Sequence, residues 1–283
     1  MRYFYVKIFL SGIFLLSLGS YGYGQEVKRS KKELKQEKRQ LKKARKLTRR
    51  FQKVRFFGVE TGGIYSQVQD TRMQSSVFDG IGGKLNLTYI SETPKGLHEV
   101  DLAGGQFAFL SPEHDESQIQ NWRADINYHY LRDFRRLAND KILWRLGGAF
   151  TGLYNFRWNT RLSNSGITWD GLASLGVASH WSGKLKIPRE GAWDYRITFP
   201  LATYVNRLPT YSLSSDGMDH SFAPIGTFTR ILSEVGISQN IGRNSPNRVR
   251  LSYTWDFYSL NESEIHDVRV ATHQVLFVFL VKL

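Results

Sequence analysis

Three pairs of neighbouring histidine and aspartate residues are the side chains of this sequence best suited to chemistry: His114-Asp115, Asp219-His220 and His266-Asp267. A neutral imidazole and a carboxylate together could bind a divalent metal, and an aspartate-paired histidine could activate water as a general base. The pairs lie in polar connecting segments, where solvent-exposed histidine and aspartate are common. We therefore predict no catalytic, metal-binding or cofactor-binding residue from them. A hydrolase with a site on these segments, acting on lipid or peptide, stays as an alternative.

A larger set of charged residues lies inside segments in which apolar and polar side chains alternate. In residues 142–158, Arg145 and Arg157 fall on one face, and Trp144 and Phe156 fall on the other. Charges of both signs recur in this way through most of the chain. We expect them to share one interior surface and to pair there, because an unpaired buried charge is costly. The residues predicted to form this structural polar network are Glu60, Lys84, Arg123, Asp125, Arg145, Arg157, Arg196, Arg248, Arg250 and Asp256.

The elements that must position these charges are β-strands, because the polarity repeats every two residues from about residue 53 onward. Compact turns alternate with longer polar connections between them. Ten strands are predicted, at roughly 54–68, 80–91, 97–110, 122–130, 142–158, 170–187, 193–201, 225–241, 248–258 and 267–283.

The first residues have the pattern of a secretory signal peptide. Arg2 and Lys7 supply positive charge, residues 8–18 form an apolar core, and small residues precede Gln25. The core is shorter than the about 20 apolar residues that a membrane helix needs. We predict a signal peptide over 1–24 and export of the remainder. The absence of cysteine also excludes thiol nucleophiles, disulfides and thiolate metal sites.

The last nine residues predict a strand that ends with the chain. Val275, Phe277, Phe279 and Val281 form an unbroken apolar face. An apolar closing strand behind a secretory signal resembles the final strand of Gram-negative outer-membrane β-barrels, although that strand usually ends in an aromatic residue and this one ends in leucine. The resemblance covers about residues 53–283 plus the signal. It implies an all-β fold, a transmembrane antiparallel up-and-down β-barrel, and an even strand number agrees with it.

The net charge of +14 is concentrated in one short segment. Residues 26–50 hold 13 basic and three acidic residues, whereas residues 51–283 hold 24 basic and 22 acidic residues. A nucleic-acid-binding domain would carry its excess positive charge on the folded body. We therefore expect no nucleic-acid partner.

The basic segment, residues 25–52, is predicted to form a short helix before the barrel. Lysine, arginine, glutamate and glutamine dominate 26–50, with no glycine or proline. Two anionic surfaces would be available to it in the periplasm, phospholipid headgroups and peptidoglycan. Each lysine or arginine near an anionic membrane adds about 1 kcal/mol of binding. A periplasmic tether and a solvated leader are both compatible with this composition.

Two arrangements of the alternating strands are possible, and the sequence favours the one with apolar side chains outward. Charges of both signs recur in mid-strand on the polar face, and tryptophan and tyrosine gather near strand ends, as they do at the two membrane interfaces. A bilayer also requires a closed barrel, because unpaired backbone groups in hydrocarbon are costly. The alternative is a periplasmic or secreted β-sandwich. We predict a location in the bacterial outer membrane, with a periplasmic N-terminal segment and the longer loops extracellular.

The interior of a ten-stranded barrel is only slightly wider than that of the smallest barrels, which side chains fill. We therefore predict a lumen plugged by the polar network, and a narrow diffusion channel is the alternative. The predicted function is a structural or interaction role in the cell envelope. Its partners would be outer-membrane lipid, other envelope proteins, and anionic phospholipid or peptidoglycan through residues 26–50.

Overall fold

The computed structural model describes residues 53–71, 74–111, 114–138, 141–159, 167–185, 191–207, 219–224, 226–241, 246–261 and 267–283, together with Gln36, Arg39 and Gln40. The chain divides into two compact units, Met1–Arg50 and Phe51–Leu283. The predicted signal peptide lies outside the described residues. So does the predicted basic helix, apart from the three isolated residues, which have helical geometry. Among the described residues, no helix has the length and apolarity to cross a membrane.

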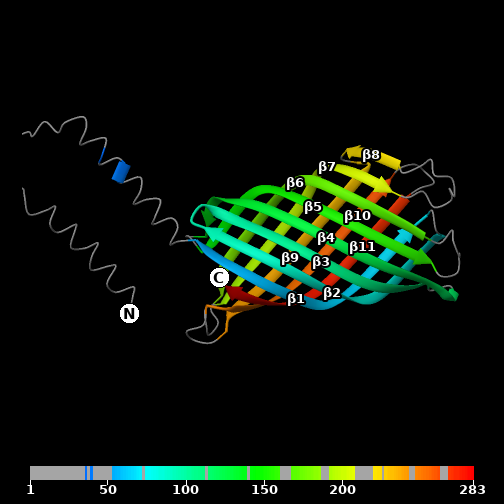
Figure 1. Cartoon of the computed structure of the whole chain (residues 1–283), viewed down its shortest axis with the longest axis horizontal. Helices are drawn as coiled ribbons and strands as arrows, with labels where there is room; N and C mark the ends of the chain where they lie inside the picture. The colour runs from blue at the N-terminus through cyan, green and yellow to red at the C-terminus, as the bar shows by residue number, and fades with distance from the viewer. Residues whose placement is uncertain are drawn as a thin grey trace, which may run out of the picture. The chain divides into compact units, whose positions relative to one another are not determined.

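The second unit is a barrel built from antiparallel strands (Figure 1). The strands are β1 (Val54–Asp70), β2 (Gln74–Thr93), β3 (Gly96–Ser111), β4 (His114–Leu137), β5 (Ile142–Asn159), β6 (Ile167–Leu185), β7 (Gly191–Arg207), β8 (Asp219–Pro224), β9 (Phe228–Asn240), β10 (Arg248–Asn261) and β11 (Asp267–Lys282).

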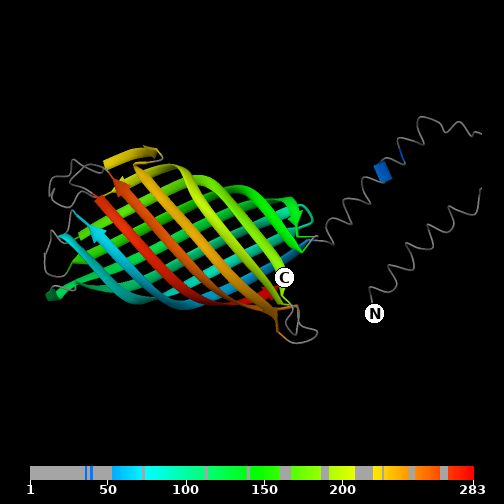
Figure 2. The same cartoon turned by 180° about the vertical axis from the view of Figure 1, so that it is seen from behind.

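The barrel is closed by pairing between its first and last strands. Around the ring the strands pair in sequence order, with β9 following β7, and β1 pairs with β11 from Phe56 opposite Lys282 to Asp70 opposite Val268. Figure 2 shows the other side of the same wall, with the strands inclined to the long axis. Because β1 begins and β11 ends at one end of the barrel, we call it the terminal end, and we call the opposite end the far end.

The closed ring contains ten strands, as the sequence predicts, and β8 is an additional short strand outside it. β7 pairs with β9 over Ala192–Thr198 and with β8 over Ala202–Arg207. Pro200 lies between these two stretches, and proline has no backbone N–H to donate to a ladder. The register between β6 and β7 also shifts at this level. The sequence predicts a loop where β8 lies, because a six-residue strand has too few alternations to be recognised.

Several strands extend well beyond their predicted limits. The predicted strand 122–130 is the centre of β4, which runs over 24 residues. Crossing a bilayer takes only about 9–11 residues of a tilted strand. The residues added at both ends of β4 are mostly polar and do not alternate regularly, so backbone pairing continues where the alternation of polarity has stopped.

The two faces of the wall differ in the sense expected for a barrel in lipid. On β11, Val275 and Phe277 are 54% and 51% exposed. Leu276, which lies between them, and Val278, which follows, are almost fully buried. On most strands the outward positions are apolar and the inward positions include the charged residues. The exterior is thus an apolar surface that requires hydrocarbon around it.

Aromatic side chains lie at two levels of this outer surface. Toward the terminal end, Trp144 stacks on Trp181, and Trp181 stacks on Tyr195, with ring centroids 6.1 Å and 5.6 Å apart. Toward the far end, Tyr154 lies beside Trp169 at 5.8 Å. Two aromatic levels with an apolar band between them are typical of the two interfaces of a membrane.

Two adjacent glycines at the closing seam provide a test of this arrangement. Gly62 faces inward, and a Cβ there would overlap the backbone carbonyl oxygen of Val275, whereas a Cβ at Gly63 would have no heavy atom within 4 Å. We predict that Gly62→Ala lowers the free energy of unfolding by about 1–3 kcal/mol through overpacking, and that Gly63→Ala does not. Urea unfolding followed by heat-modifiable mobility on gels measures both. Equal midpoints for the two variants would contradict the seam geometry.

Candidate functional site

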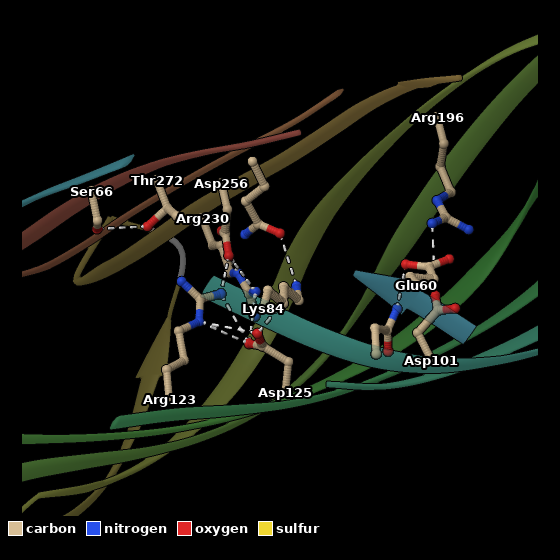
Figure 3. A network of polar contacts seen from close by, with 12 residues as sticks. Glu60, Ser66, Lys84, Asp101, Arg123, Asp125, Arg196, Arg230, Asp256 and Thr272 are labelled. Carbon is tan, nitrogen blue, oxygen red and sulfur yellow. Dashed lines mark hydrogen bonds and ion pairs between the residues drawn. The ribbon is translucent and has the colours of Figure 1, made fainter. Parts of the chain in front are cut away.

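The inward side chains of the barrel form clusters of ion pairs at successive levels of the lumen. Each cluster combines residues from strands far apart in sequence, since the inward positions of all strands face the same narrow space. Figure 3 shows two of these clusters, with Arg123, Asp125 and Asp256 in one and Arg196 in the other.

The central cluster joins β2, β4, β9 and β10. The Nε and Nη2 atoms of Arg123 donate to the Asp125 carboxylate at 2.9–3.1 Å, and Nη2 also donates to Asp256. Arg230 donates to both oxygens of Asp256, at 2.9 Å and 2.8 Å. The Nζ atom of Lys84 lies 3.7 Å from Asp125. All five side chains are nearly removed from solvent, so each charge depends on its neighbours for neutralisation.

A second cluster lies on the terminal side of the central one. Arg196 on β7 donates to Glu99 on β3 and to Glu234 on β9. Arg250 on β10 contacts Glu234 at 2.6 Å and Asp194 at 2.5 Å. One arginine thereby connects opposite walls of the lumen.

Two further carboxylates of this level accept from neutral donors, and one of them, Asp101, also lies 3.8 Å from Arg196. The Nδ2 atom of Asn86 donates to Glu60 at 2.6 Å, and the hydroxyl of Thr88 donates to Asp101 at 2.6 Å. Glu60 forms no ion pair within 4.0 Å among the described residues, so its predicted place in the network is through a hydrogen bond.

A third cluster lies near the far end, where Arg157 and Arg207 share two carboxylates. Arg157 lies 3.0 Å from Asp70 and 2.5 Å from Asp170, and Arg207 lies 3.0 Å and 2.9 Å from the same two groups. These four side chains are at most 2% exposed. Of the four, only Arg157 is among the network residues predicted from the sequence. The other three fall at or beyond the predicted strand ends, and extending the alternation along β1, β6 and β7 would have placed them inward.

The remaining two predicted network residues lie near the terminal mouth. Arg145 donates to Asp133 at 2.9 Å and to Glu92 at 2.7 Å. The guanidinium of Arg248 lies over the ring of Phe56, 4.7 Å from its centroid, and makes no ion pair with a described carboxylate. Arg248 therefore makes a cation–π contact and lies outside the ion-pair clusters.

Apolar layers also fill the lumen, which the sequence analysis does not predict. Near the far end, inward side chains including Val68, Phe78, Phe228, Leu260 and Val268 pack into one buried cluster. Near the terminal end, Leu97 and Leu131 belong to a second, and Phe56, Val278 and Leu280 form a third. These inward apolar residues lie on the same face as the charges, so the alternation alone cannot separate them from polar lining.

Little free space is left between the charged clusters. The cavity bounded by Glu60, Asp101, Arg123, Arg196 and Asp256 measures about 30 Å³, room for one or two water molecules. A larger recess of about 180 Å³ lies toward the terminal end, beside Arg145 and Arg248. At the level of the smaller cavity the side chains fill the cross-section of the barrel.

The histidine–aspartate pairs form no site that the described residues reveal. His114 begins β4 and Asp219-His220 begins β8, with only their backbone described, and His266 lies outside the described residues. The backbone N–H of Asp267 donates to the Thr71 hydroxyl at 2.8 Å. In the part of the chain that the structure describes, no group of three or more histidine, aspartate or glutamate side chains could hold a metal ion.

The comparisons with known proteins find only distant likenesses, all of them to solved structures. No protein-family model and no curated protein sequence matches the chain. Among solved structures, the outer membrane protein OprG from Pseudomonas aeruginosa matches at 11% identity and a TM-score of 0.29, over 82% of this chain and 97% of that one. The β domain of the Bordetella autotransporter Brka matches at 9% identity and 0.31, over 78% and 98%. A mutant of the TodX monoaromatic hydrocarbon channel matches at 8% identity and 0.28, over 81% and 90%.

The chain itself forms a closed antiparallel β-barrel with an apolar exterior, as the sequence predicts. The assignment as a membrane-type barrel rests on the strand pairing and the outward apolar face described above.

The central cluster predicts which single change is most damaging. Asp256 is 1% exposed and neutralises both Arg123 and Arg230. We expect Asp256→Asn to lower the free energy of unfolding by about 3–5 kcal/mol, because it leaves buried positive charge uncompensated. Urea unfolding in detergent measures this change.

The matched control for this variant is an exposed ion pair on the same barrel. Arg269 is 57% exposed and lies 3.5 Å from Asp267. We expect Arg269→Gln to cost about 0–1 kcal/mol. Similar losses for the two variants would show that the central cluster is not energetically special.

Proposed function

We propose that this protein is an integral β-barrel of the bacterial outer membrane with a lumen closed by its own side chains, and that it has a structural or interaction role in the cell envelope. The observation that carries the proposal is the filled interior, in which ion-pair clusters alternate with apolar layers. A protein that conducts solutes needs a continuous aqueous path. This barrel instead packs its lumen in the manner of a protein core.

The outward apolar band and the two aromatic levels support lipid as the first partner. The terminal end would face the periplasm, because the chain enters and leaves the barrel there and outer-membrane barrels begin and end on that side. The connections at the far end, the longest of which joins β7 to β8, would then be extracellular, as is usual for this class. Those loops and the basic segment are the parts available for contact with other envelope proteins.

The basic segment supports a second element of the proposal, a periplasmic tether. Residues 26–50 carry 13 basic and three acidic side chains and lie directly before the barrel in sequence. With this charge the segment would bind an anionic surface, either phospholipid headgroups or peptidoglycan. It would hold the barrel to that surface without any specific pocket.

The closed lumen is tested by electrical recording. We expect the protein purified from membranes to give no steady single-channel steps in planar lipid bilayers, because the side-chain clusters leave no continuous water path. An open porin reconstituted in the same bilayers serves as the positive control. Large, steady steps would exclude the plugged lumen and favour the narrow diffusion channel.

The tether is tested by deleting residues 26–50 behind an intact signal peptide. The shortened protein should bind anionic vesicles or isolated peptidoglycan sacculi at least about tenfold less, since removal of a net ten positive charges removes most of the electrostatic attraction. A co-sedimentation assay at two salt concentrations measures this, with neutral vesicles as the control. Binding equal to that of the full chain would dismiss the tether.

A further inference from the structure

The hairpin between β4 and β5 carries a basic and aromatic surface at the terminal end of the barrel. Arg132, Arg135 and Arg136 are exposed, and Phe134 among them is 62% exposed. An exposed phenylalanine ring next to three arginines in sequence combines two opposite needs. The ring is more stable away from water, whereas the guanidinium groups are more stable in contact with water or anions. An apolar ring and cations are accommodated together at the interface of a membrane.

The exposure of Phe134 follows from a bulge in β4. Asp133 pairs with Arg145 and Arg135 pairs with Trp144, so Phe134 is an extra residue without a partner on β5. Bulges re-aim side chains in this way. The ring lies edge-on to Trp144, with centroids 4.8 Å apart and planes at 77°. Trp144 belongs to the terminal aromatic level, so Phe134 extends that level toward the end of the barrel.

The local charge is positive because the nearest carboxylate is turned away. Asp133 accepts from the Nε atom of Arg145 at 2.9 Å, on the lumen side of the wall. Arg132, Arg135 and Arg136 make no ion pair with any carboxylate that the structure describes, and Lys141 on the same hairpin makes none either. The other acid of the hairpin, Asp140, lies outside the described residues.

We propose that this surface, formed by Arg132, Phe134, Arg135 and Arg136, binds the phosphate headgroups of anionic glycerophospholipids in the leaflet at the terminal end. Guanidinium groups match phosphate oxygens in fork geometry. The Phe134 and Trp144 rings set the level, since such rings lie where the acyl region meets the headgroups. Phosphatidylglycerol offers a phosphate with net negative charge at that level, whereas phosphatidylethanolamine has an ammonium that offsets it.

The proposal depends on insertion of the barrel in lipid and is independent of the basic segment at residues 26–50. The proposed periplasmic orientation enters only in naming the leaflet. Under that orientation the lipid is a phospholipid of the inner leaflet. A terminal end facing outward would instead meet the phosphates of lipid A.

The test is native mass spectrometry of the full mature protein in detergent with added lipid. Phosphatidylglycerol should be retained in preference to phosphatidylethanolamine. The variant Arg132→Gln, Arg135→Gln, Arg136→Gln should retain at least about tenfold less phosphatidylglycerol. Each basic group near an anionic headgroup strengthens binding severalfold, and this variant removes three of them. Replacement of the same three residues by lysine keeps the charge but removes the fork, and retention should be intermediate.

The matched control removes three positive charges at the same end on the opposite part of the ring. Lys53, Arg55 and Lys282 lie at the terminal ends of β1 and β11 and are exposed. Their triple replacement by glutamine should leave retention of phosphatidylglycerol within about twofold of the unaltered protein. Heat-modifiable mobility establishes that each variant is folded before binding is compared, and the lysine variant carries the test if the glutamine variant does not fold.

Four results would overturn the proposal. An equal loss of phosphatidylglycerol retention in the two glutamine variants would mean that the lipid is attracted by the net charge of this end and not by a local surface. Unchanged retention in both would mean that lipid binds elsewhere. Equal retention of phosphatidylethanolamine would exclude recognition of a net anionic headgroup. Stronger retention of lipid A than of phosphatidylglycerol would reject the phospholipid assignment and the proposed orientation together, leaving the plugged lumen unaffected.

Discussion

The structure depends on one constraint, that every backbone hydrogen-bonding group inside a bilayer must find a partner within the protein. Pairing of β1 with β11 satisfies it by closing the ring. Closure divides the side chains of each strand into two sets, one in lipid and one in the lumen. Apolar residues then cover most of the outside, and most of the mid-strand charges that the structure describes are confined to a narrow space with charges from other strands.

Confinement explains why the lumen contains compact clusters with little water between them. Removing a charge from water costs several kcal/mol, and this cost is offset only where opposite charges and hydrogen-bond donors converge. Arg157 and Arg207 with Asp70 and Asp170 meet this condition with two positive and two negative groups. Apolar layers near each end seal the clusters from bulk water. The side chains of the interior therefore stabilise the barrel by joining strands across the lumen, and the same side chains would close it under the proposed function.

The two surfaces of the wall also differ in what they can recognise. Most charged side chains of the lumen pair with one another, so few of them are available to bind a solute. The unpaired basic groups that the structure describes lie instead at the terminal rim, beside the aromatic level. Under the proposed function, the barrel would meet its surroundings through its rims, its loops and the segment that precedes it in sequence.

The sequence by itself determined the architecture, because a period of two is a local property of each strand and needs no knowledge of its neighbours. It therefore predicts the ten-strand ring and the inward side of residues such as Arg123 and Asp256. Only the tertiary structure decided which inward charges meet, as Arg123 and Asp256 do across 133 positions in sequence. It also decided that Arg248 lies over Phe56, and that β8 takes the place of β9 beside the end of β7. The physical reason is that partners across a barrel are set by the register and tilt of every intervening strand, and these follow from the closed ring as a whole.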